Sequence, residues 1–186
     1  MVKDGLTIVD EYLIPALDVV GRKYERGEIF LPQLIQSAET VKSAFIVIKE
    51  NMNLEEEKQV SKGKIILATV KGDIHDIGKN IVKIILENYG FDIIDLGKDV
   101  PIANIVETAK KENIKLVGLS ALMTTTVKSM EDTIKSLREN KVKCKIFVGG
   151  AVLNQEYADM IKADYYAKDA QEAVKIAQNL FKDINE

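Results

Sequence analysis

One histidine occurs among the 186 residues, and it lies in the loop-like stretch 71–80, which follows a run of apolar residues. A neutral imidazole is a good metal ligand, and Asp73, two residues before His75, could accept a hydrogen bond from the other ring nitrogen. Gly78 could let a bulky group approach the backbone. A single histidine cannot build an all-protein metal site, so a macrocyclic cofactor would have to supply the remaining ligands. The alternative is a surface loop in which His75 caps a helix.

Hydroxyl side chains follow a second apolar run, 116–119, at Ser120, Thr124, Thr125 and Thr126. They could hydrogen-bond a polar ligand or extend the Asp73–His75 pair, and the alternative is a helix N-cap from Thr125 or Thr126. After a third apolar run, Gly149-Gly150 offers backbone without side chains, for which the alternative is an ordinary turn. The glycine-rich phosphate-binding motifs of dinucleotide and nucleoside-triphosphate sites are absent from the sequence.

From Lys64 onward, five apolar runs alternate with five helical patterns, which indicates an α/β fold with a parallel, doubly wound sheet. The first helix should carry Ile77, Ile81, Ile84 and Ile85 on one face and end at Gly90. A flavodoxin-like strand order of 2-1-3-4-5 would bring the loops after the first and third strands together at the ligand-binding edge. The strands are expected at 65–70, 93–94, 116–119, 146–148 and 165–167.

Two helical patterns precede this sheet. The first carries Val9, Leu13 and Val20 on one face and contains Pro15, so we expect a kink there. The second begins at Leu31-Pro32. We expect a helical segment at 1–52, a solvated linker at 53–63 and the α/β domain at 64–186.

Composition limits the function. A chain of 186 residues is too short for a complete (β/α)₈ barrel, which typically needs about 250 residues. A net charge of −3 argues against a nucleic-acid partner. Neither a membrane-spanning run nor a signal peptide is visible, and the single cysteine, Cys144, fits a reducing cytoplasm and a place in the core.

The three motifs together resemble a known family. Asp73-x-His75-x-x-Gly78, then Ser120-x-Leu122, then Gly149-Gly150, is similar to the signature of the cobalamin-binding domain. It resembles the corrinoid module of cobalamin-dependent methionine synthase and the related corrinoid proteins of methylotrophic and acetogenic methyltransferases. The stretches 21–24 and 30–33 look like that family's helical cap. The family cap usually has four helices, so two would be a truncated cap, whose exposed apolar faces could allow a homodimer.

The resemblance implies a role for each matching residue. His75 would be the lower axial ligand of cobalt in place of the cofactor's dimethylbenzimidazole. Asp73 would hydrogen-bond His75, and Thr126 would continue the relay. Tyr24 and Leu31 would shield the upper face of the corrin, although packing at a helix hairpin is the alternative. The displaced nucleotide tail would run past Gly78, Ser120, Leu122, Thr124, Gly149 and Gly150. The cofactor-binding residues implied are Tyr24, Leu31, Asp73, His75, Asp76, Gly78, Ser120, Leu122, Thr124, Thr126, Gly149 and Gly150.

The function implied is a cytoplasmic methyl-carrying module that binds cobalamin, as methylcobalamin, base-off and His-on. It would work only with methyl-donor and methyl-acceptor methyltransferase domains or subunits. We expect transfer from methyltetrahydrofolate to homocysteine, as in methionine synthase. The alternative is a stand-alone corrinoid protein of a methylamine- or methanol-type system. An adenosylcobalamin sensor, a mutase small subunit and a receiver-like domain match less well.

Overall fold

The computed structural model describes residues 5–50 and 61–185, so most of the expected linker 53–63 lies outside the described residues. The chain divides into two compact units: Met1–Gly63 with Ile84–Asp92, and Lys64–Lys83 with Ile93–Glu186. The first unit contains a helical hairpin. Its helical segments are α1 (Gly5–Ile8), the π-helical η1 (Val9–Leu13), α2 (Ile14–Glu25) and α3 (Leu31–Glu50).

The expected irregularity at Pro15 takes the form of the π-helical turn η1. A proline has no amide hydrogen and cannot donate to the preceding turn of the helix. Immediately before it, the Ile14 N–H donates to the carbonyl of Val9, five residues back. The hairpin then closes at Gly27, which adopts a left-handed φ of 70° and donates its N–H to the Tyr24 carbonyl.

The second unit is built on a five-stranded sheet in the order β2-β1-β3-β4-β5, which confirms the predicted fold class and strand order. Neighbouring strands from β1 to β5 pair in parallel. The strands are β1 (Lys64–Thr69), β2 (Asp92–Asp95), β3 (Leu116–Ser120), β4 (Lys145–Gly149) and β5 (Tyr165–Tyr166). The helices are α5 (Ile77–Asn88), α6 (Ile102–Lys111), α7 (Val127–Glu139), α8 (Gln155–Met160) and α9 (Ala170–Asn185), and a short 3₁₀ turn, η2 (Thr124–Thr126), precedes α7.

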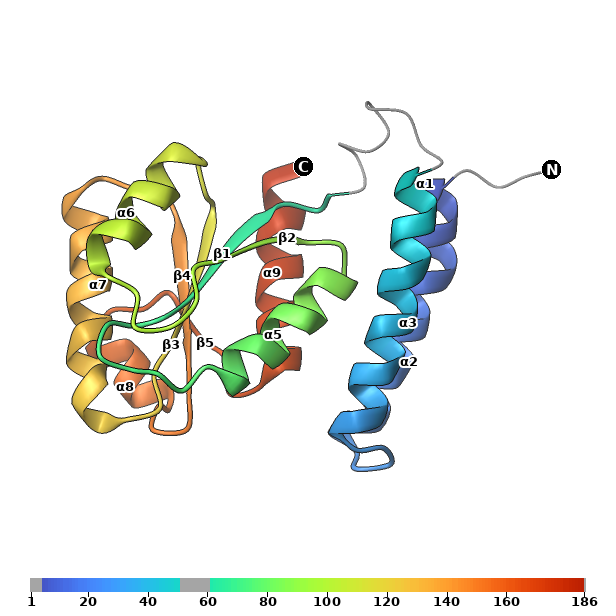
Figure 1. The fold of residues 1–186 in the computed structure, drawn as a ribbon, viewed down its shortest axis with the longest axis horizontal. Coiled ribbons are helices and arrows are strands. Elements are labelled where there is room, and N and C mark those ends of the chain that lie inside the picture. The colour runs from blue at the N-terminus through green and yellow to red at the C-terminus, as the bar shows by residue number, and fades with distance from the viewer. Residues whose placement is uncertain (1–4, 51–60, 186) are drawn as a thin grey trace. The chain divides into compact units, whose positions relative to one another are not determined.

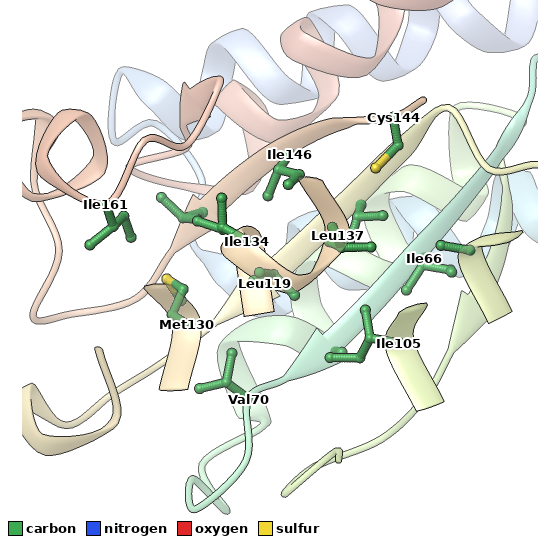
Figure 2. Packing of buried hydrophobic residues seen from close by; sticks show 14 of the residues in the cluster. Ile66, Val70, Ile105, Leu119, Met130, Ile134, Leu137, Cys144, Ile146 and Ile161 are labelled. Carbon is green, nitrogen blue, oxygen red and sulfur yellow. The ribbon is translucent and has the colours of Figure 1, made fainter. Parts of the chain in front are cut away.

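Helices cover both faces of the sheet: α6, α7 and α8 lie on one face, and α5 and α9 on the other (Figure 1). The face under α6, α7 and α8 is a continuous apolar cluster (Figure 2). In β1 this cluster takes Ile66, Ala68 and Val70, so the alternation of a strand turns Ile65, Leu67 and Thr69 toward α5 and α9.

The prediction for one residue of this helix face, Ile77, is wrong. Ile77 is 78% exposed, whereas Ile85, on the same predicted face, is buried. Ile77 is the first residue of α5, and the chain reaches it from the loop at the carboxyl end of β1. It therefore stands at the edge of the sheet, where no strand covers it.

Candidate functional site

Two loops meet at the carboxyl edge of the sheet. β1 pairs with β3 so that Thr69 lies opposite Ser120, and the Val70 N–H donates to the Ser120 carbonyl at 3.1 Å. The loop with His75 and the loop with Leu122 therefore begin side by side. This is the switch point at which sheets of this order bind their ligands.

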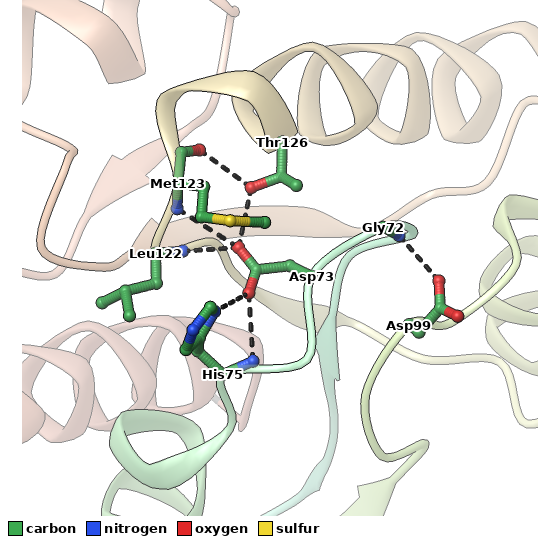
Figure 3. A network of polar contacts seen from close by, with 7 residues as sticks. All are labelled: Gly72, Asp73, His75, Asp99, Leu122, Met123 and Thr126. Carbon is green, nitrogen blue, oxygen red and sulfur yellow. Dashed lines mark hydrogen bonds and ion pairs between the residues drawn. The ribbon is translucent and has the colours of Figure 1, made fainter.

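Asp73 is the centre of this region, fully buried and hydrogen-bonded on both carboxylate oxygens (Figure 3). Oδ1 lies 2.8 Å from His75 Nδ1 and accepts the His75 backbone N–H at 3.0 Å. Oδ2 accepts the Leu122 N–H at 2.7 Å, the Met123 N–H at 3.3 Å and the Thr126 hydroxyl at 2.7 Å. The structure thus brings together Asp73, His75 and Thr126.

These contacts keep Asp73 ionised. Burial by itself raises the pKa of a carboxyl group. Hydrogen bonds from the Thr126 hydroxyl, from the Leu122 amide and from His75 outweigh burial and hold the pKa of Asp73 well below its usual range. The charge is therefore stabilised by neutral donors, with no lysine or arginine hydrogen-bonded to it among the described residues.

His75 is oriented by this carboxylate. With Asp73 ionised, the ring hydrogen belongs on Nδ1, and Nε2 keeps its lone pair. The side chain is 45% exposed. Three exposed apolar side chains lie on the two site loops and the first residue of α5: Ile74, Ile77 and Leu122. Residues 5–50 and 61–185 contain no group of three or more His, Cys, Asp and Glu side chains arranged for a metal ion.

Thr126 stands at the N-cap position of α7, but its side chain makes no capping hydrogen bond. Its hydroxyl lies 2.7 Å from Asp73 Oδ2 and 2.8 Å from the Met123 carbonyl. The N-cap interpretation of Thr126 is therefore wrong: the hydroxyl donates to the Asp73 carboxylate, and its oxygen accepts no N–H of the first turn of α7. Thr124 and Thr125 are exposed, and Ser120 is half-buried.

The glycines of the motifs fall into two groups. A Cβ at Gly78 would meet nothing within 4 Å, so the space beside it is open. A Cβ at Gly150, whose φ is 141°, would lie 1.8 Å from the Ala121 carbonyl oxygen, and one at Gly149 would lie 3.1 Å from the Ala167 oxygen. The direction in which a side chain would point is thus occupied by the chain's own backbone at Gly149 and Gly150, whereas it is open at Gly78.

Small or polar side chains form a row on the α5/α9 face, at the carboxyl ends of three strands. Thr69 of β1, Ser120 of β3 and Gly149 of β4 are register partners. Within residues 5–50 and 61–185, the buried Thr69 hydroxyl has no hydrogen-bond partner, and neither has Nε2 of Gln171 in the first turn of α9. Sequence reasoning missed both residues, although a hydroxyl inside the otherwise apolar run 65–70 was a signal for Thr69.

The remaining candidates make no hydrogen bond to Asp73 within residues 5–50 and 61–185. Tyr24 and Leu31 belong to the helical hairpin, on either side of its turn, and both are partly exposed. Asp76 is half-buried in the loop before α5. Cys144 is buried, as expected, and burial raises the pKa of its thiol. Among the described helices, none has the length and apolarity needed to cross a membrane.

Comparison with known proteins gives consistent matches. Residues 63–175 and residues 2–49 each match a family described as B12 binding domain. Dimethylamine corrinoid protein 2 of Methanosarcina acetivorans is 41% identical over 96% of this chain and 83% of its own length. The structure of the methanol:cobalamin methyltransferase complex MtaBC from Methanosarcina barkeri superposes with a TM-score of 0.84 and 33% identity, over 97% of this chain and 69% of that chain. The Methanosarcina barkeri monomethylamine corrinoid protein gives a TM-score of 0.62 and 37% identity, over 96% and 84%.

Proposed function

The chain belongs to the family of B12-binding domains, and on that premise we propose that it is the corrinoid protein of a methylamine-type methyltransferase system. It binds a corrinoid of the cobalamin class. The resemblance to methionine synthase had favoured homocysteine as the methyl acceptor. That preference is not supported, because the similar proteins are named for dimethylamine and monomethylamine, and one complex for methanol. The alternative of a stand-alone corrinoid protein agrees better.

The single observation that carries the proposal is the state of His75. Its Nδ1 is engaged by an ionised, buried Asp73, its side chain is exposed, and Nε2 has no hydrogen-bond partner in the part of the chain that the structure describes. An imidazole held in this way is oriented to bind a metal at Nε2. When bound, the corrinoid supplies the cobalt chemistry by which a methyl group is carried.

The surroundings of His75 fit a large, mostly apolar ring. Exposed Ile74, Ile77 and Leu122 offer apolar surface on the two site loops and at the start of α5, and a Cβ at Gly78 would meet no atom within 4 Å. Exposed apolar side chains gathered at one edge of a soluble domain are typical of a binding site. These residues would cover the lower face of the corrin and exclude water from the His75 ligand bond.

The α5/α9 face fits a polar group entering beside the sheet. The Thr69 hydroxyl and Gln171 Nε2, which have no partner among the described residues, would hydrogen-bond the displaced nucleotide tail next to Ser120 and Gly149, with Nε2 as a donor. Phe147 lies in the way of deeper entry, because its ring fills the space over Gly118, where a Cβ would be 2.3 Å from Phe147 Cζ. The tail would therefore stay near the carboxyl edge or displace that ring.

We further propose the remaining assignments on the same basis. The cap at 1–52, the linker at 53–63 and the domain at 64–186 would form one functional chain, with Tyr24 and Leu31 over the upper corrin face and Asp76 and Thr124 at its margin. The cofactor would be carried as methylcobalamin in the cytoplasm. A methyltransferase subunit would dock on the cobalt side. Exposed apolar faces of the cap would allow a homodimer.

The test is the visible absorption spectrum of the purified protein with hydroxocobalamin. We expect a His-on spectrum for the wild type and a base-off spectrum for His75→Gly. Lys141→Gly, an exposed position with a left-handed backbone and outside the site, is the control for the substitution to glycine. An identical spectrum in His75→Gly would refute His75 as the axial ligand.

The methyl donor is tested separately. The loaded protein would be mixed in turn with methyltransferases for dimethylamine, monomethylamine, methanol and homocysteine, and demethylation or methylation of the corrinoid would be followed by absorbance. Turnover only with the homocysteine enzyme would restore the methionine synthase interpretation.

A further inference from the structure

The chain after β2 runs along the loop that holds His75. The Leu96 N–H donates to the Leu67 carbonyl at 2.9 Å, and the Thr69 N–H donates to the Gly97 carbonyl at 3.0 Å. The Val100 N–H then donates to the Thr69 carbonyl at 3.1 Å. The segment 96–100 is therefore fixed against the end of β1 by main-chain hydrogen bonds, directly before the site loop starts.

Asp99 is the residue of this segment that reaches the site loop. Its carboxylate Oδ1 accepts the Gly72 N–H at 2.7 Å (Figure 3), and its own backbone N–H donates to the Asp73 carbonyl at 2.9 Å. Asp99 adopts a left-handed φ of 50°, and Gly72 a φ of 85°. Non-glycine residues rarely take this conformation, and aspartate and asparagine are among those that tolerate it best. One residue thus holds both residues that lead into His75.

The segment that leads to Asp99 is itself fixed by the contacts of Asp95. Asp95 accepts the Gly97 N–H at 2.9 Å and pairs with Lys79 at 2.6 Å and with Lys83 at 3.2 Å. Burial raises the pKa of Asp95, but these partners outweigh burial and lower it below its usual value. The Lys79 side chain is almost fully buried and comes four residues after His75. The segment 95–99 is therefore tied to the chain on both sides of the histidine.

We propose that Asp99 is a positioning residue for the axial histidine: by fixing Gly72 and the Asp73 backbone, it sets the direction of the Asp73 carboxylate and thereby of the His75 ring. The inference rests on the proposed role of His75 as the cobalt ligand. Asp99 acts through Asp73 and need not touch the cofactor.

Three variants separate the acceptor from the backbone conformation. Asp99→Gly keeps the left-handed backbone but removes the acceptor for Gly72. Asp99→Asn keeps the left-handed backbone and an acceptor oxygen for the Gly72 N–H, so it is the rescue variant. Asn113→Gly is the matched control, because Asn113 also has a left-handed φ (49°) and a side chain that accepts a hydrogen bond, from Lys115, but lies before β3 at the opposite end of the strands.

Two readouts are needed. The first is hydrogen exchange of the Gly72 amide in the protein without cofactor, measured by NMR. The second is the His-on fraction with hydroxocobalamin. In Asp99→Gly we expect Gly72 exchange to rise about tenfold and the Kd for hydroxocobalamin to rise about tenfold, since one hydrogen bond to a charged group is lost. Asp99→Asn and Asn113→Gly should match the wild type.

The outcomes distinguish the two proposals. Wild-type exchange and a wild-type His-on fraction in Asp99→Gly would overturn the positioning role and leave the axial ligand intact. Failure of Asp99→Asn to rescue would also overturn it. If the wild type itself is not His-on, the axial-ligand proposal fails, and with it the role of Asp99 toward that ligand, whatever the exchange at Gly72 shows.

Discussion

Asp73 and Thr69 are four residues apart and both are fully buried, yet their side chains differ in how many hydrogen bonds they make. Each oxygen of Asp73 has two or more hydrogen-bonding contacts, whereas the Thr69 hydroxyl has no partner among the described residues. Nε2 of Gln171, on α9 of that same α5/α9 face, is likewise buried without a partner in the described part of the chain.

The difference separates two ways of building a binding site. The Asp73 region is complete before any ligand arrives, so the histidine is already aimed. The α5/α9 face is incomplete, and a buried polar group without a partner typically costs about 1 to 3 kcal/mol. A ligand that supplies the missing partners would recover that free energy on binding.

The largest effect should come from Asp73→Asn. We expect a loss of about 2 to 4 kcal/mol in the free energy of unfolding, because an amide cannot accept all the hydrogen bonds that converge on the carboxylate. Urea unfolding at pH 7 measures the loss. An unchanged midpoint would show that the network is not a source of stability.

The same substitution predicts a pH dependence. The pKa of Asp73 is lowered in the folded state, so its contribution is fully present above the unfolded pKa of about 3.9 and is lost as the pH falls further toward the folded value. The stability difference between wild type and Asp73→Asn should therefore narrow below about pH 4. A difference that stays constant from pH 7 to pH 3 would contradict this assignment.

Thr126→Val should cause the next largest loss in the free energy of unfolding. Removal of the hydroxyl deletes a hydrogen bond to an ionised group, which is worth about 1.5 to 3 kcal/mol. Thr126→Ser retains the hydroxyl and should recover most of the loss in the same urea experiment. Equal losses in the two variants would mean that packing of the methyl group, and not the contact with Asp73, is responsible.

On the α5/α9 face, removal of a hydroxyl should raise the free energy of unfolding rather than lower it. Thr69→Val removes a hydroxyl without a partner and should stabilise the cofactor-free protein by about 1 kcal/mol. Thr133→Val is the matched control, because the buried Thr133 hydroxyl donates to the Ser129 carbonyl at 2.7 Å and its loss should destabilise by about 1 kcal/mol. Cobalamin affinity, measured by titration, should fall only in Thr69→Val. Destabilisation by both substitutions would remove the contrast between the two regions.

The smallest effect is expected at Gly78. Alanine there should stabilise α5 by about 0.5 to 1 kcal/mol, because glycine is a poor helix former and the added methyl meets no atom. We expect weaker cobalamin binding at the same time. Gly150→Ala serves as the opposite case, since its Cβ would collide with Ala121 and unfold that edge. Unchanged cobalamin affinity in Gly78→Ala would show that the open surface is not used.

Sequence reasoning succeeded where the pattern was local and repeated. The apolar runs predicted the strand order, and the spacing of Asp73 and His75 predicted their hydrogen bond. It could not find Asp99, because its contact with Gly72 joins two loops 27 residues apart. It also could not show that the backbone of Ala121 and Ala167 closely approaches Gly150 and Gly149. Ile77 fitted the helical period, but periodicity does not say where a helix passes beyond the sheet.

The two outermost strands of the sheet are short, four residues in β2 and two in β5. An edge strand presents unpaired amide and carbonyl groups that another chain can pair with, and short edges limit such pairing. Beyond β2, the chain from Leu96 to Val100 is already hydrogen-bonded to β1. The sheet therefore offers little template for edge-to-edge aggregation.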